Sequence, residues 1–600
     1  MKKSKNISAF RIIVCLLISL YLNNIYIYIS LLILLLILNY KEFILTFILL
    51  FIILKVNSNE NDFIKFGIVE RKINNYYVVD KLLYKAKIVS DEIQIGDIVL
   101  TNRYKYLDNV NYLKKNIKFE IFDYTIISNF KLRQYLYKKI NSFNDEIKSI
   151  LNKYIYNINN YDELEFNLTY NFIIYYLFRY IYSKNKLISI ILLNIYSLIF
   201  YFDIKFYLII IDYILSKFNI KHSNKFCIKI IILLLINNRL IYNYSICVPL
   251  ILSLYRFLDT KISFKSYFVL ISSLFFGDIN ILKIFLYKYE IYFQIVIILI
   301  CFLVLIFPNI SIILLDFIKI YSYYENINLS IRGQISIISI IFYFLLYKYI
   351  SYSDLLNIIL ILLLIYLPLN NPFLKISFID VGQGDSILIK LPLKKGNILI
   401  DTGSEYNYFK LNNYLNKQGI DNIDFLIITH NDSDHNGNIS KLQKEYNIKN
   451  IIYEKQDIVL DNIYLKNLNF TEYNNDNDNS LIFLTNINGL NYLFTGDISS
   501  YCEKMLVDRY NFKVDVLKVS HHGSNTATSE YFVSNILPKY SIISTSGMYG
   551  HPSNIVLDIL NEYMSKTYIT KTSGNIEIYG LPWFNLIKTD NREFVIINKE

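Results

Sequence analysis

The sequence predicts a multi-pass α-helical membrane protein with a small OB-like β-barrel insertion and a carboxy-terminal α/β domain that binds metal ions. Three observations predict this architecture. Apolar runs recur up to about residue 370, one early segment alternates polar and apolar residues, and His and Asp cluster late in the chain. With 600 residues, 54% of them hydrophobic, the chain is too long for one core and too apolar for an ordinary soluble enzyme.

Net charge and cysteine content bear on which partners and which metal sites the chain can have. The formal net charge of +11 suits contact with an anionic polymer or anionic lipid head groups, or it reflects lysine-rich drift in composition. The five cysteines are scattered without a CxxC pair. The cysteines therefore give no indication of a disulfide framework or a thiolate metal site.

Residues 1–56 are predicted to form transmembrane segments. A lysine-rich start precedes three apolar runs, at 7–22, 25–39 and 43–54, whereas a cleavable signal peptide would have one. If the lysines stay in the cytoplasm and all three runs cross, the residues that follow emerge on the outer face of the membrane.

Residues 57–130 are predicted to form the OB-like β domain. Period-two alternation broken by Asn, Asp and Gly indicates short strands. Five-stranded barrels of the OB type often bind oligonucleotides. A β module that only packs against its neighbours explains the pattern equally well.

Residues 131–369 are predicted to form a multi-span region. A charged, helical stretch leads into apolar runs that we expect to make about eight to ten crossings. An even number returns the chain to the barrel's side, so the barrel and the last domain are both expected outside the cytoplasmic membrane. Pro368 and Pro372 end the last helix.

Residues 370–600 carry five of the six histidines. The strand-like run 425–429 ends in His430, Asp432, Asp434 and His435, four ligand-capable residues that converge on a space for one or two divalent ions. The alternative is a polar loop with solvated histidines.

Three later elements also end in polar residues. Asp497 closes a Thr-Gly-Asp turn, where a carboxylate could bridge two cations, although such turns are common. His521 and His522 end another apolar strand. His551 precedes a proline that suits the first turn of a helix, and is either an active-site group or a surface residue.

Taken in order, these motifs resemble the metallo-β-lactamase superfamily, and more closely the ComEC competence family of DNA uptake channels in the bacterial inner membrane. The resemblance implies an αββα sandwich with a two-metal site at its strand ends. The stretches that carry it are 379–386, 400–403, 430–435, 479–481, 495–497, 520–524 and 549–552.

The chain departs from these families at identifiable positions. Asp432 stands where the superfamily has histidine, and Asn479 or Ser480 stands where its middle histidine is sought. One cation site should therefore be oxygen-rich, which favours Mn²⁺ or Mg²⁺ as much as Zn²⁺. The central region also lacks the family's SGLHV-like motif, because His222 is its only histidine.

We expect two divalent cations, each bound by its own ligands. His430 and Asp432 are assigned to one cation, Asp434 and His435 to the other, and Asp497 lies between them. The sixth ligand is His521 or His522, and we assign His521 to the metal.

The expected reaction is hydroxide attack on a phosphodiester. Asp434 is assigned to catalysis as well as to metal binding, and His522 and His551 are assigned to proton donation toward the substrate.

The resemblance implies a DNA uptake protein that passes one strand through the membrane and degrades the other with a metal-dependent nuclease. Its expected partners are single-stranded and duplex DNA, the lipid bilayer, and other competence proteins such as a DNA receptor and a cytoplasmic translocase; a homodimer is left open. The alternatives are a membrane-tethered phosphodiesterase with no transport role, and a channel whose last domain is vestigial and metal-free.

Overall fold

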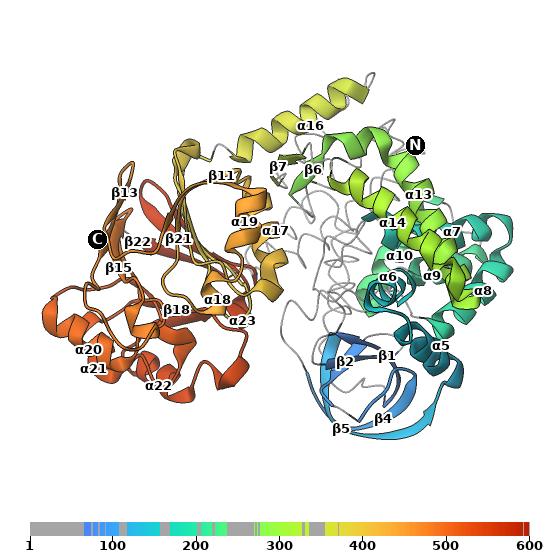
Figure 1. The fold of residues 1–600 in the computed structure, drawn as a ribbon, viewed down its shortest axis with the longest axis horizontal. Helices are drawn as coiled ribbons and strands as arrows, with labels where there is room; N and C mark the ends of the chain where they lie inside the picture. Colours follow the sequence, from blue (N-terminus) through green and yellow to red (C-terminus); the bar gives the residue numbers. More distant parts are fainter. Residues whose placement is uncertain are drawn as a thin grey trace, which may run out of the picture. The chain divides into compact units, whose positions relative to one another are not determined.

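The chain is described from a computed structural model (Figure 1). It divides into two compact units, 1–262 with 282–329 and 263–281 with 330–600, and each is described by itself. Gaps of one to three residues occur inside the described ranges, and Val269 and Ser273 are described in addition. The described ranges are 65–106, 117–156, 168–200, 206–218, 222–236, 277–326, 330–334, 354–369 and 371–598.

The membrane segments predicted from the sequence are only partly within these ranges. Those of residues 1–56 lie outside the described residues. Within the described residues, no helix has both the length and the apolar character that crossing a membrane requires.

A closed five-stranded barrel lies inside the range in which the sequence predicted one (Figure 1). Its strand order is β1-β2-β3-β5-β4; β3 and β5 are parallel, and the other pairs are antiparallel. Val69, Val79, Val99 and Ile121 fill its interior. The strands are β1 (Phe66–Ile73), β2 (Tyr76–Asp80), β3 (Lys85–Ile88), β4 (Asp97–Tyr106) and β5 (Ile117–Asn129).

Helices follow the barrel in the same unit. Arg133 ties the first of them to the carboxyl end of the helix Lys186–Ile199, because its guanidinium donates to the carbonyls of Ser197 and Ile199. The helices are α5 (Lys131–Asn141), α6 (Asp145–Tyr156), α7 (Leu168–Lys184), α8 (Lys186–Ile199), α9 (Phe206–Ser216), α10 (His222–Ile236), α13 (Ile281–Ile306) and α14 (Ser311–Asn326).

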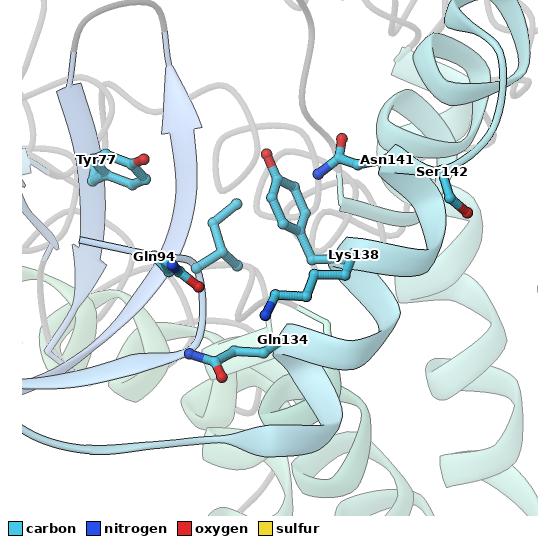
Figure 2. Close-up of a pocket in the computed structure, with 8 residues that line it drawn as sticks. Tyr77, Gln94, Gln134, Lys138, Asn141 and Ser142 are labelled. Carbon is cyan, nitrogen blue, oxygen red and sulfur yellow. The ribbon is translucent and has the colours of Figure 1, made fainter. Parts of the chain in front are cut away.

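A cavity of about 470 Å³ opens between the barrel and α5. Figure 2 shows Tyr77 and Gln94 on the barrel side, and Gln134, Lys138 and Asn141 on α5. The lining thus combines aromatic, amide and ammonium groups.

Two mixed β-sheets form the carboxy-terminal domain. The eight-stranded sheet runs in the order β12 (Asn447–Ile452), β11 (Asn422–Ile427), β10 (Asn397–Ile400), β9 (Ile387–Lys390), β8 (Leu374–Phe378), β20 (Ile576–Gly580), β21 (Phe584–Thr589), β22 (Phe594–Asn598). The seven-stranded sheet runs β13 (Ile458–Leu460), β14 (Ile463–Asn467), β15 (Phe483–Ile487), β16 (Leu490–Phe494), β17 (Val516–Lys518), β18 (Tyr540–Ile543), β19 (Lys566–Ile569).

Three apolar clusters hold these layers together. The central cluster lies between the sheets, and it includes Phe378 from one and Phe494 from the other. A second cluster packs α17 (Tyr408–Gln418) and α19 (Ile439–Glu445) on the eight-stranded sheet. The third packs α20 (Ser500–Arg509), α21 (Glu530–Ile536) and α22 (Asn554–Glu562) on the seven-stranded sheet. The predicted αββα sandwich is confirmed.

A short ribbon from the middle of the chain packs on this domain. It consists of β6 (Asp278–Asn280) and β7 (Ser330–Arg332). The Arg332 guanidinium lies 4.3 Å from the centre of the Tyr446 ring and donates to the carbonyl of Glu445 at 2.8 Å. The carboxy-terminal unit therefore includes residues that precede the predicted boundary at 370.

Candidate metal centre

The candidate site lies where strands of both sheets end. β10 and β11 are parallel neighbours, and so are β16 and β17. Parallel strands bring their carboxyl ends to the same edge of a sheet, and these ends lead into the loops that bear Asp401, His430, Asp497 and His522. Each loop leaves a buried apolar strand, so its first polar side chains are held close to the core.

Three buried histidines and the half-buried Asp434 meet around the Asp497 carboxylate. Its Oδ2 lies 3.3 Å from His435 Nε2 and 3.2 Å from His522 Nε2. Asp434 Oδ2 lies 3.3 Å from the same His522 nitrogen. The His430 ring centre is 4.1 Å from that of His435. The ligand-capable atoms of His430, His435 and Asp497 lie within 4.8 Å of one another, as do those of Asp434, His435 and His522.

The unsatisfied atoms of this cluster fit divalent cations. The Nε2 atoms of His430, His435 and His522 and the Oδ1 of Asp497 are buried without a hydrogen-bond partner. Buried polar atoms are rarely left in this state, because each costs free energy. Three imidazole nitrogens and a carboxylate oxygen are also the donor set that Zn²⁺ and Mn²⁺ accept.

The opposite nitrogen of each imidazole is already occupied. His435 Nδ1 is 2.9 Å from Asp401 Oδ2, His522 Nδ1 is 2.9 Å from the carbonyl of Ser544, and His430 Nδ1 is 3.0 Å from a threonine hydroxyl. The carboxylate and the carbonyl can only accept, so His435 and His522 donate from Nδ1. Their Nε2 lone pairs are therefore free for a cation.

The Asp497 carboxylate and the imidazoles of His435 and His522 shift one another's pKa values. Burial alone would raise the pKa of Asp497, but His522 and His435 hold it well below its usual range. Burial would lower the pKa of both histidines, yet Asp497 and the neighbouring carboxylates raise it well above the ordinary value. The carboxylates around the two rings thus favour positive charge at this place, which bound cations would also supply.

Some of the oxygen ligands predicted for the cation site at His430 lie close to that residue. Asp432 Oδ2 is 3.5 Å from His430 Nε2, but the Asp432 side chain is 49% exposed. Ser480 faces the site, because its Oγ is 3.4 Å from His430 Nδ1 and accepts a hydrogen bond from the backbone amide of Asp497. Asn479 instead donates to the carbonyl of Tyr473. Of the two residues considered for the middle position, Ser480 is the one at the site.

The two adjacent histidines lie in different surroundings. His522 is 2% exposed and faces Asp434 and Asp497. His521 is less buried, and its ring centre lies 5.9 Å from that of His551. The sequence assigned His521 to metal and His522 to proton donation, but only His522 lies among the ligand-capable groups.

His551 lies with His521 rather than with the buried cluster. Burial and the charges of His521 and His522 lower the pKa of His551. A neighbouring aromatic ring, that of Tyr549, is 80% exposed and centred 6.3 Å away. His521 and His551 therefore lie at a more accessible edge of the site. His522, the chain neighbour of His521, connects this edge to the buried cluster.

Three buried residues of the site were not among those predicted from the sequence. Asp401 and Asp385 lie behind His435 and His522, and Lys518 pairs with Asp385. Both aspartates belong to motifs that the sequence singled out, and each follows or lies in a glycine-containing loop. The motifs that contain these aspartates could have indicated them. A sequence, however, does not distinguish a metal ligand from a residue that holds a ligand in place.

The chain resembles known proteins in its carboxy-terminal part. Residues 379–480 match the model of the metallo-beta-lactamase superfamily. The chain is similar to ComE operon protein 3 of Bacillus subtilis (strain 168), at 30% identity over 34% of this chain and 32% of that protein. Recombination protein 2 of Haemophilus influenzae is 31% identical over 36% of this chain and 30% of that protein. Competence protein ComA of Neisseria gonorrhoeae is 30% identical over 34% of this chain and 31% of that protein.

The matched part spans about a third of the length of these curated relatives. Among solved structures, the metallo hydrolase Igni18 of Ignicoccus hospitalis aligns at 12% identity and a TM-score of 0.23, over 34% of this chain and 98% of that one. The predicted resemblance to the ComEC family, with a metallo-β-lactamase domain at the carboxyl end, is confirmed.

Proposed function

We propose that the carboxy-terminal domain is a metal-dependent phosphodiesterase that cleaves DNA, within a chain that takes up DNA through a membrane. The observation that carries the enzymatic part is the set of buried Nε2 and carboxylate atoms that converge without hydrogen-bond partners. The uptake part is supported by the competence and recombination proteins to which the chain is similar.

The residues divide between two cations as follows. Asp434, His435 and His522 would hold one, His430 and Asp432 the other, and Asp497 would lie between them. Two divalent cations supply an activated water and stabilise charge on a phosphoryl oxygen. Mn²⁺, Zn²⁺ and Mg²⁺ all suit this mixed set, with Mg²⁺ the poorest match for imidazoles.

The remaining chemistry belongs to the protein's own groups. Asp401 holds the His435 ring through Nδ1, so that its Nε2 stays directed at the centre. His521 and His551 lie at the accessible edge, where either can donate a proton to the leaving oxygen of a phosphodiester. Burial and the charges of His521 and His522 lower the pKa of His551, which favours its neutral form.

The barrel is proposed to hold single-stranded DNA. Its cavity against α5 is lined by Tyr77 and Tyr137, whose rings suit base stacking. Amides there suit base edges, and Lys138 suits a phosphate (Figure 2). The net charge of +11 would attract a polyanion.

The apolar runs of residues 1–56 and 131–369 support a membrane location. We propose a multi-pass protein of the cytoplasmic membrane, with the barrel and the hydrolase domain on the outer side. DNA receptors and cytoplasmic translocases are its proposed protein partners, and a homodimer is a proposed assembly.

Cleavage tests the enzymatic proposal. The full chain, purified in detergent, is incubated with end-labelled single-stranded and duplex oligonucleotides and Mn²⁺. We expect cleavage that EDTA abolishes and that Asp497→Asn reduces by about 10²-fold or more, since the shared ligand is weakened. Intact oligonucleotides with every added cation would contradict the proposal.

Uptake separates a transporter from a membrane-tethered phosphodiesterase. A strain without the chain should import no labelled DNA, and expression of the native chain should restore import. If import is normal without the chain while the purified protein still cleaves DNA, the tethered enzyme is the correct function.

A further inference from the structure

Two buried carboxylates stand behind the histidines of the centre, and their own partners differ. Asp401 Oδ2 lies 2.9 Å from His435 Nδ1. Its other contacts are neutral, because both the amide and the hydroxyl of Thr429 donate to it at 2.8 Å. No cation offsets Asp401 among these contacts, so its negative charge acts on His435.

Asp385 stands behind His522 but is paired with a cation. Its Oδ2 lies 2.5 Å from the Nζ of Lys518, and the two side chains are 2% and 1% exposed. Its Oδ1 lies 3.6 Å from His522 Nδ1 and has no hydrogen-bond partner. Lys518 Nζ also donates to the carbonyl of Val519, which fixes the ammonium at the end of β17.

Asp385 is close enough to the centre to be a ligand itself. Ligand-capable atoms of Asp385, Asp497 and His522 lie within 4.8 Å of one another. The ammonium of Lys518 holds one Asp385 oxygen away from that role. A buried carboxylate without this cation would be an unpaired charge, which a divalent ion would satisfy.

We propose that Asp385 and Lys518 are a positioning pair that sets the cation affinity of the His522 side of the centre. Asp385 places a negative charge behind the His522 ring, whose Nδ1 donates to the carbonyl of Ser544, and Lys518 keeps Asp385 out of coordination. The inference rests on the proposed metal centre. The two residues act in opposite directions, since the carboxylate attracts a divalent cation and the ammonium repels it.

Binding of Mn²⁺ alone tests the pair. Free Mn²⁺ is followed by electron paramagnetic resonance as it is titrated into the full chain in detergent. We expect Asp385→Asn to weaken the affinity by about 10-fold or more, as for other residues that support ligands. Lys518→Met should tighten it by a similar factor, and Lys518→Arg should keep the native value.

The opposite signs separate this role from a structural one. If both single variants weaken binding, the pair only maintains the fold and the inference is overturned. If the native chain binds no Mn²⁺, the proposed metal centre fails instead.

A double variant covers the case in which Lys518→Met does not fold. Replacing both members of a buried ion pair by neutral groups is often tolerated. In the Asp385→Asn background, Lys518→Met should then raise Mn²⁺ affinity through loss of the ammonium's repulsion. An unchanged or weaker affinity in that background would overturn the inference.

Discussion

At the scale of single residues, the site depends on a backbone feature that the sequence conceals. His521 and His522 are adjacent and both have left-handed φ angles, of 45° and 53°. Such angles are unfavourable for residues other than glycine and cluster at functional sites. They send the two rings to different places, so the sequence could predict a histidine ligand here but not which histidine.

Alanine substitution of each histidine tests this assignment. His522→Ala should lower Mn²⁺ affinity by about 10²-fold or more, because a ligand between Asp434 and Asp497 is lost. His521→Ala is the matched control, and it should bind Mn²⁺ within about 3-fold of the native chain while it reduces cleavage about 10- to 10²-fold. Equal loss of Mn²⁺ binding in both variants would contradict the geometry.

At the scale of elements, the glycine-containing loop after β8 holds the metal-binding loop in place. Gly384 has a φ of 107°, and a Cβ on it would lie 2.0 Å from the carbonyl oxygen of Asp434. The amide of Asp385 donates to that same oxygen at 3.3 Å. The sequence predicted these strand-end loops, because each apolar run stops in polar residues. It did not predict the β6 and β7 ribbon, whose strands have three residues each.

Gly384→Ala should displace the loop of Asp434. We expect it to lower Mn²⁺ affinity and to destabilise the domain by more than the roughly 1–2 kcal/mol that a left-handed alanine costs alone. Gly550→Ala is the matched control, since Gly550 also has a positive φ but a Cβ there meets no atom within 4 Å. Thermal unfolding and Mn²⁺ titration of both variants measure the difference, and equal effects would show that the contact with Asp434 is unimportant.

At the scale of the whole molecule, the two units should respond differently to metal. The α/β character of the last domain could be recognised from its strand-like runs beyond residue 372, and its αββα layers were implied by the resemblance to the metallo-β-lactamase superfamily. The packing partners of the apolar region could not, since uniformly apolar helices have no polar face to mark their orientation.

Hydrogen exchange of the full chain with and without Mn²⁺ measures this response. A cation that binds only the folded domain stabilises it by about 2.7 kcal/mol at 100 times its Kd. Slower exchange should therefore appear in peptides around residues 425–435 and 490–525, and none in the barrel at 66–129. Protection confined to the barrel would place the cation elsewhere.

Metal content is the most direct measurement of the central account. The full chain, purified in detergent and dialysed against Mn²⁺ or Zn²⁺ and then against metal-free buffer, is analysed by inductively coupled plasma mass spectrometry beside Asp497→Asn. We predict up to two ions per native chain and at least one fewer in the variant, because Asp497 lies between both ligand groups. A native chain that retains neither metal would contradict the account.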